Sequence, residues 1–132
     1  MVILDTNAIL RFVLADHPDM ARQTQACIQE NAVLIPIEVI AEMVYVLSGV
    51  YKVTRDEIKS LVSRLLQTRH IHTPNDMLIL RAMEFYAETD LDFVDCLMLG
   101  YRKVCGYDVL TFDKKLQACL YDIVLAQSEE VD

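Results

Sequence analysis

Glycine and proline are scarce in this chain, which has only three of each among 132 residues. With 54% hydrophobic residues, this composition excludes a disordered or collagen-like chain and predicts one domain over residues 1–132 with a substantial core. No apolar run is long enough to cross a bilayer, so no membrane partner is expected. The N-terminus lacks a basic region, and Asp5 interrupts its short apolar stretch, which argues against a signal peptide.

Cysteine is present without a pattern, and basic residues are outnumbered. The four cysteines form no Cys-x-x-Cys pair and have no histidines at zinc-finger spacing, so we expect small apolar side chains in a reducing cytoplasm. The net charge of −8 argues against nucleic-acid binding driven by charge alone. It does not exclude a nucleic-acid enzyme whose acidic residues are neutralised by metal ions. Residues 51–75 reverse the balance, with five basic residues against two acidic ones.

Short apolar runs alternate with longer amphipathic stretches, a pattern typical of an α/β fold built around a parallel sheet. Strands are predicted at residues 2–4, 33–35, 70–72, 108–111 and 122–125. Helices are predicted at residues 17–30, 37–50, 54–68, 74–89, 93–104 and 113–120, and an apolar, helix-like stretch directly follows Asn7. The helix at 54–68 has a capping box, because Glu57 follows Thr54 by three residues.

Four carboxylates lie where the strands and helices of such a fold meet. Asp5 and Asp113 follow predicted strands, Glu42 lies on the helix after the second strand, and Asp95 is in the first turn of the helix from Phe93. In open α/β sheets, ligands bind beyond the carboxyl ends of the strands. Acidic groups that converge there raise one another's pKa, and a hard divalent cation such as Mg²⁺ or Mn²⁺ relieves the repulsion.

Each of these acids also has a purely structural interpretation. Asp5 and Asp113 suit helix N-caps, Glu42 suits an exposed helix position, and an acid in a first turn is stabilised by the helix dipole. Asp92 competes with Asp95, since spacing does not separate a cap from a metal ligand at these two positions. The joint occurrence of all four acids at such junctions favours a site.

Four segments of this chain together resemble the PIN-domain family. Residues 4–11 (Leu-Asp-Thr-Asn-Ala-Ile-Leu-Arg) resemble its opening, residues 38–47 its second motif, residues 92–97 its third and residues 110–116 its fourth. The order and the chain length are similar to those of small PIN toxins from bacterial VapBC toxin–antitoxin modules. The resemblance covers essentially the whole chain and implies a three-layer α/β/α fold whose central, mainly parallel sheet has about five strands.

The resemblance also implies an activity and a set of site residues. It implies an endoribonuclease dependent on Mg²⁺ or Mn²⁺, in which metal-activated water attacks an RNA phosphodiester in line. Asp5, Glu42 and Asp95 would bind the metal, with Asp113 as a more variable fourth acid. Asn7 and Thr111 would orient ligands or water, and Thr6 would do so or cap the first helix. The implied partners are RNA, a cognate antitoxin protein and a second copy of the chain in a homodimer.

Several basic residues are candidate RNA contacts. We expect Lys52, Arg55 and Lys59 to help seat RNA on the helical hairpin formed by residues 37–50 and 54–68. Arg11 and Lys114 are further candidate phosphate contacts, although lysines at a helix start often only meet solvent. His70 and His72 alternate along a short strand, and without a third ligand at a suitable spacing they are expected to be structural.

Three other functions compete with the nuclease. A haloacid-dehalogenase-like phosphatase needs a second aspartate two residues after the first, where this chain has Asn7. A response-regulator receiver needs an acidic pair after the first strand and a phospho-acceptor aspartate after the third, where this chain has Thr73, Pro74 and Asn75. Both predict an acyl-phosphate, so binding of beryllofluoride would distinguish them. A catalytically idle PIN domain that only binds protein is the remaining alternative.

Overall fold

The computed structural model describes residues 1–130, and the chain forms two compact units, Met1–Asp76 and Met77–Asp132. Each unit has fully buried apolar side chains of its own. In the first unit they include Ile9, Val33 and Ile40, and in the second Ile79, Met83 and Leu99. The prediction of a single domain over the whole chain stays a prediction.

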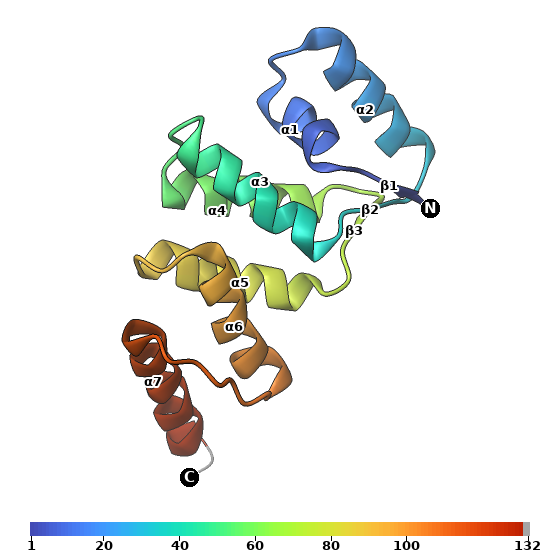
Figure 1. Ribbon diagram of the computed structural model, residues 1–132. Helices are drawn as coiled ribbons and strands as arrows, with labels where there is room; N and C mark the ends of the chain where they lie inside the picture. Colours follow the sequence, from blue (N-terminus) through green and yellow to red (C-terminus); the bar gives the residue numbers. More distant parts are fainter. Residues whose placement is uncertain (131–132) are drawn as a thin grey trace. The chain divides into compact units, whose positions relative to one another are not determined.

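The first unit is a parallel α/β arrangement (Figure 1). Its three strands are β1 (Val2–Ile3), β2 (Val33–Leu34) and β3 (Ile71–His72), paired in the order β1-β2-β3. Val2 pairs with Val33, and Val33 pairs with Ile71, all in parallel register. Each crossover between strands is a pair of helices. The first pair is α1 (Thr6–Leu14) and α2 (Pro18–Glu30), and the second is α3 (Ile37–Gly49) and α4 (Arg55–Gln67).

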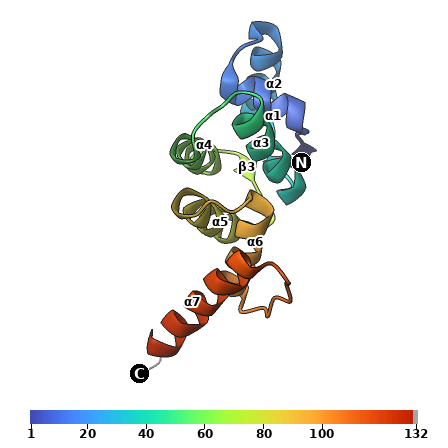
Figure 2. The same cartoon turned by 60° about the vertical axis from the view of Figure 1, so that its left-hand side comes forward.

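Local sequence signals explain where these helices begin and which face they bury. The Thr54 hydroxyl accepts a hydrogen bond from the Glu57 amide at 3.3 Å, so the predicted cap starts α4. On α3, Ile40, Val44 and Leu47 recur at helical spacing and are almost completely buried. The two helices of this hairpin are joined by a loop at residues 50–54, which Figure 2 shows as a curved segment between α3 and α4.

All regular secondary structure of the second unit is helical, within the residues that the structure describes. It comprises α5 (Asp76–Glu88, whose first residue belongs to the first unit), α6 (Phe93–Gly100), a π-helical turn η1 (Tyr101–Cys105) and α7 (Lys114–Glu130). A Cβ atom at Gly100 would lie 3.2 Å from the carbonyl oxygen of Leu78, so glycine allows α5 and α6 to approach closely. The rings of Tyr86 and Phe93 meet edge to face at 6.0 Å.

The predicted α/β class with a parallel sheet is confirmed, but the sheet has three strands among residues 1–130 rather than about five, and two predicted strands are not found. The predicted strand at 122–125 is part of α7, which continues well past the predicted helix end at Leu120. Residues 108–111 form neither a helix nor a strand, and they have no strand partner among residues 1–130. A short apolar run is compatible with either state. In α7 the helical state is favoured over a strand, because Leu116, Leu120 and Ile123 then form one buried face at positions i, i+4 and i+7.

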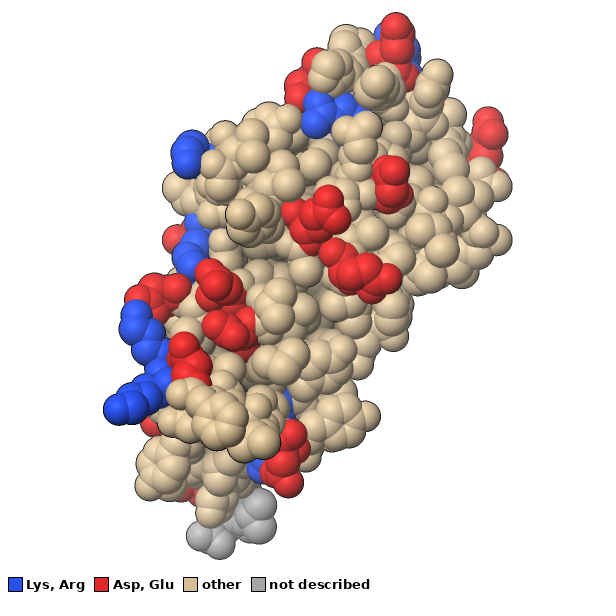
Figure 3. All heavy atoms as spheres, in the orientation of Figure 1, with Lys and Arg blue, Asp and Glu red and all other residues tan. Residues whose placement is uncertain are grey.

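The remaining expectations concern cysteines and membrane spans. The structure shows four free cysteines, of which Cys96 is buried and Cys27, Cys105 and Cys119 are half-buried. Only Cys96 therefore matches the expected core position fully. Within residues 1–130, no helix is both long enough and apolar enough to span a membrane. The face drawn in Figure 3 carries several separate groups of acidic side chains, as the net charge implies.

Candidate functional site

Asp5 begins α1 at the point where β1 ends. Leu4, directly before it, is buried and its amide donates to the Leu34 carbonyl at 3.2 Å, which fixes the end of the strand. The backbone of Asp5 is extended, and its Oδ1 accepts a hydrogen bond from the Ala8 amide at 2.8 Å. Asp5 is therefore an N-cap and remains exposed. The cap engages one of the two carboxylate oxygens, so capping and ligand binding are compatible at this position.

Glu42 lies in the middle of α3 on its exposed side. Its neighbours Met43 and Val44 are about 99% buried, whereas Glu42 itself is exposed. Glu38, one turn earlier, is also exposed and shares this side of the helix. The structure thus presents Glu42 to solvent from a helix whose opposite face is anchored in the first unit.

Asp95 and Asp113 are electrostatic neighbours in the second unit. Asp95 is half-buried in the first turn of α6. Burial, followed by the negative charges of Asp113 and Asp92, raises the pKa of Asp95. Asp92 occupies the N-cap position of α6, but its side chain makes no capping hydrogen bond. The charged form of the Asp95 carboxyl group is thus destabilised by burial and by these two neighbouring charges.

Asp113 is positioned by contacts on both sides of it. Its Oδ1 accepts a hydrogen bond from the Leu116 amide at 2.9 Å, so it caps α7. The Thr111 hydroxyl accepts a hydrogen bond from the Asp113 amide at 3.1 Å, and the Gln117 side chain donates to the Thr111 carbonyl at 2.7 Å. Thr111 therefore contacts the backbone of one of the candidate acids. Thr6 and Asn7 lie in the first turn of α1, half-buried and exposed respectively.

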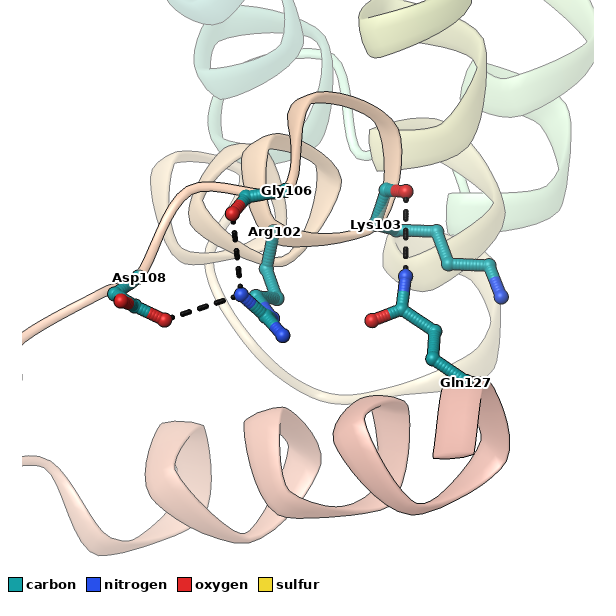
Figure 4. Close-up of polar contacts among 5 residues, drawn as sticks. All are labelled: Arg102, Lys103, Gly106, Asp108 and Gln127. Atoms are coloured by element: carbon teal, nitrogen blue, oxygen red, sulfur yellow. Dashed lines mark hydrogen bonds and ion pairs between the residues drawn. The ribbon is translucent and has the colours of Figure 1, made fainter. Parts of the chain in front are cut away.

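A network around Arg102 supports the segment that leads to Asp113 (Figure 4). One guanidinium nitrogen of Arg102 donates to the Gly106 carbonyl at 3.2 Å and pairs with Asp108 at 3.1 Å. Gly106 has a φ of 74°, a left-handed conformation that favours glycine at the end of η1. Gln127 of α7 donates to the Lys103 carbonyl at 3.5 Å. Arg102 was not identified from the sequence. Gly106, which ends a helix, and Asp108 shortly after it were the sequence signal that could have pointed to this network.

The four predicted acids fall into two pairs in different units, Asp5 and Glu42 in one and Asp95 and Asp113 in the other. Within residues 1–130, no three carboxylate, imidazole or thiol groups converge as a ready-made metal site. The donor chemistry nevertheless fits a hard cation, because all four groups are carboxylates and the charge of Asp113 already disfavours ionised Asp95.

The candidate RNA contacts differ in their surroundings. Lys52 and Lys114 are exposed, while Arg55 and Lys59 are half-buried on α4. Lys115, next to Lys114, pairs with Asp90 at 2.9 Å, and this hydrogen bond raises the pKa of Lys115.

Arg11 does not suit the phosphate contact that the sequence predicted for it. It is only 8% exposed, and its guanidinium is engaged by Asp16 and Tyr51. The hydrogen bond to Tyr51 raises the pKa of Arg11, burial lowers it, and the charge of Asp16 raises it. The phosphate contact stays a prediction, because helical spacing does not show which side of α1 faces a neighbour.

His70 has a structural contact, as predicted. Its Nδ1 lies 2.9 Å from the Ile28 carbonyl oxygen, which joins the start of β3 to α2. Its φ of 74° is left-handed.

The family model of the PIN domain matches residues 2–119, and the chain belongs to this family. Among curated proteins, the chain is similar to a protein named VapC ribonuclease from Aquifex aeolicus (strain VF5). The two are 27% identical over 123 residues, which cover 89% of this chain and 90% of that protein. No solved structure gave a significant match.

Proposed function

We propose that this protein is an endoribonuclease that depends on Mg²⁺ or Mn²⁺ and acts as the toxin of a toxin–antitoxin pair. The observation that carries the proposal is the match of the PIN family model to residues 2–119, and the pair Asp95 and Asp113, where burial and like charge raise the pKa of Asp95, supports a site there. Groups with such perturbed pKa values are concentrated at functional sites. Membership of the PIN family and the similarity to a protein named VapC ribonuclease give the reaction class.

The chain's own residues would act by binding and orientation. Asp5, Glu42 and Asp95 would hold a divalent cation, with Asp113 as a fourth acid. When bound, such an ion supplies Lewis acidity toward water and phosphate oxygens. Thr111 would hold the Asp113 backbone in place, as its 3.1 Å hydrogen bond does already. Thr6 and Asn7 would orient ligands or water at the start of α1.

Metal-dependent RNA cleavage by the purified chain tests the proposal. We expect total RNA to be cut with Mn²⁺ or Mg²⁺ and left intact with EDTA. Glu42→Gln should reduce the rate by about 10²-fold, because it removes one charged donor from the site. Glu38→Gln is the matched control, since Glu38 is an exposed acid one turn earlier on the same helix. Equal activity of the two variants would remove Glu42 from the site, and absence of cleavage with either metal would favour the idle protein-binding module.

We further propose that Lys52, Arg55 and Lys59 seat RNA, supported by the excess of basic residues at 51–75. Replacing all three by glutamate should raise KM for RNA at least about tenfold and flatten the dependence of binding on salt. The rate at saturating RNA should change little, because these residues would bind phosphates rather than reacting atoms. Unchanged affinity and salt dependence, measured by fluorescence anisotropy with labelled RNA, would contradict this.

The proposed protein partners are a cognate antitoxin and a second copy of this chain. Both rest on the resemblance to toxins of the PIN family. Light scattering on the purified chain tests the homodimer, and a monomeric mass at micromolar concentration would exclude it. Co-purification with the product of a neighbouring gene tests the antitoxin. The organisation of residues 1–132 as a single PIN domain belongs to the same proposal.

A further inference from the structure

Arg11 is a charged residue that is buried at a position where an apolar side chain would also pack. It lies on α1 and is 8% exposed, a position that arginine adopts only when its charge is paired. Leu10, its neighbour on the helix, is 5% exposed, and Ile9 is fully buried. A leucine or methionine would fill such a position without needing partners, so the guanidinium requires a separate explanation.

The guanidinium of Arg11 joins the turn after α1 to the segment that follows α3. One terminal nitrogen donates to Asp16 Oδ2 at 2.8 Å, and the other donates to the Tyr51 hydroxyl at 3.1 Å. Asp16 lies in the turn after α1, where Ala15 is left-handed with a φ of 52° and donates its amide to the Arg11 carbonyl at 2.9 Å. Arg11 thus holds this turn through its backbone as well as its side chain.

Tyr51 belongs to the segment that ends α3. Its amide donates to the Val46 carbonyl at 3.3 Å, and the Val53 amide donates to the Leu47 carbonyl at 3.0 Å. The backbone of Tyr51 is therefore held against the end of α3. Since α1 and α3 also pack on each other, the hydrogen bond from Arg11 to Tyr51 restrains how one helix slides along the other.

These two helices carry the two candidate metal ligands of the first unit. Asp5 caps the start of α1, and Glu42 lies on α3. A shift of α1 along α3 would change the separation of the two carboxylates. We propose that Arg11, through Tyr51 and Asp16, is a positioning residue that fixes Asp5 relative to Glu42 for divalent-cation binding. This inference rests on the proposed nuclease function and deepens it.

The planar fork of arginine is needed for this role. Two terminal nitrogens reach two partners at once in fixed directions, whereas the single ammonium of lysine is a point charge. A phosphate contact would behave differently, because lysine also binds phosphate. Arg11→Lys consequently separates the two roles. It should resemble Arg11→Met if Arg11 positions the site, and resemble the wild type if Arg11 contacts RNA.

The experiment compares Arg11→Lys, Arg11→Met and Tyr51→Phe with the wild type. Mn²⁺ affinity is measured by isothermal titration calorimetry without RNA, and kcat and KM are measured with a labelled RNA. Tyr51→Phe deletes only the hydroxyl of a residue that is 39% exposed, so it keeps the test valid if the Arg11 variants fail to fold. Arg22→Met is the matched control, because Arg22 pairs with Asp19 on the exposed side of α2.

We expect Tyr51→Phe to weaken Mn²⁺ binding and lower kcat by about fivefold, with KM for RNA unchanged. Both Arg11 variants should lose about 10- to 100-fold in Mn²⁺ affinity and in kcat. Arg22→Met should match the wild type in both. Wild-type Mn²⁺ affinity in both Tyr51→Phe and Arg11→Lys would overturn the inference. If the wild type binds Mn²⁺ but cuts no RNA, weaker binding by these variants still supports positioning while the nuclease proposal fails.

Discussion

Asp5→Asn should abolish RNA cleavage while leaving the stability of the fold intact. Asparagine caps a helix about as well as aspartate, so the hydrogen bond from the Ala8 amide at 2.8 Å should persist. The substitution removes the negative charge that a divalent cation requires. We expect a loss of about 10³-fold in cleavage rate and a melting temperature within about 1 °C of the wild type.

Asp5→Ala should lose the cap as well as the charge. Removing an N-cap costs about 1 kcal/mol, which lowers the melting temperature by roughly 3–5 °C for a chain of this size. Thr54→Ala is the control for the cap alone, since Thr54 caps α4 through the Glu57 amide. It should lose similar stability and keep cleavage within about threefold. An Asp5→Asn protein with full activity would show that Asp5 is only a helix cap.

Asp95→Asn should likewise abolish cleavage, by about 10³-fold, but it should stabilise the metal-free protein. Burial and the charges of Asp113 and Asp92 raise the pKa of Asp95. The folded chain then holds a proton on Asp95 more tightly than the unfolded chain does. The free energy of unfolding therefore falls as the pH rises from the ordinary value of 3.8 through the raised folded pKa, and the penalty persists at neutral pH.

Replacing Asp95 by neutral asparagine removes this penalty. In EDTA at pH 7 we expect the melting temperature of Asp95→Asn to rise by about 1–3 °C, as differential scanning calorimetry would measure. Mn²⁺ should raise the melting temperature of the wild type and have little effect on the variant. Asp92→Asn is the matched control, three residues earlier at the N-cap of α6. It should keep both cleavage and the response to Mn²⁺.

The opposite results would assign different roles to Asp95 and Asp92. If Asp95→Asn lowers the melting temperature in EDTA and keeps activity, Asp95 is a first-turn acid that stabilises the dipole of α6. If Asp92→Asn loses activity and Asp95→Asn does not, the two residues exchange roles. The sequence left the roles of these two acids open. The structure places Asp92 at the N-cap of α6 and Asp95 in its first turn, and which of them binds metal stays a prediction.

The sequence alone predicted the α/β class and the approximate positions of the strands and helices within residues 1–76. Strands near 2–4, 33–35 and 70–72 and the helix pairs between them were predictable because each depends on signals within a few residues. Thr54 at its cap and Pro18 at a helix start are examples. The four candidate acids were also named from the sequence, since their order resembles the PIN motifs, and their role as metal ligands stays a prediction.

The C-terminal part could not be predicted at the same level. Residues 122–125 form a short apolar run that fits either a strand or a helix, and the choice depends on burying Leu116, Leu120 and Ile123 together. Residues 108–111 contain the apolar pair Val109 and Leu110, yet Leu110 is 87% exposed and no strand partner lies beside it within residues 1–130. Strand formation needs a neighbour far away in the chain, and no local pattern encodes that.

Local sequence thus determined the elements, their caps and the identity of the candidate ligands, because those depend on interactions between residues a few positions apart. Tertiary structure alone decided the partners of Arg11, of which Tyr51 lies 40 residues away. It also decided which acid is electrostatically perturbed, since the pKa of Asp95 responds to burial and to Asp113 across 18 positions of chain. Burial and long-range charge are properties of the packed chain, so they become visible only once the chain is folded.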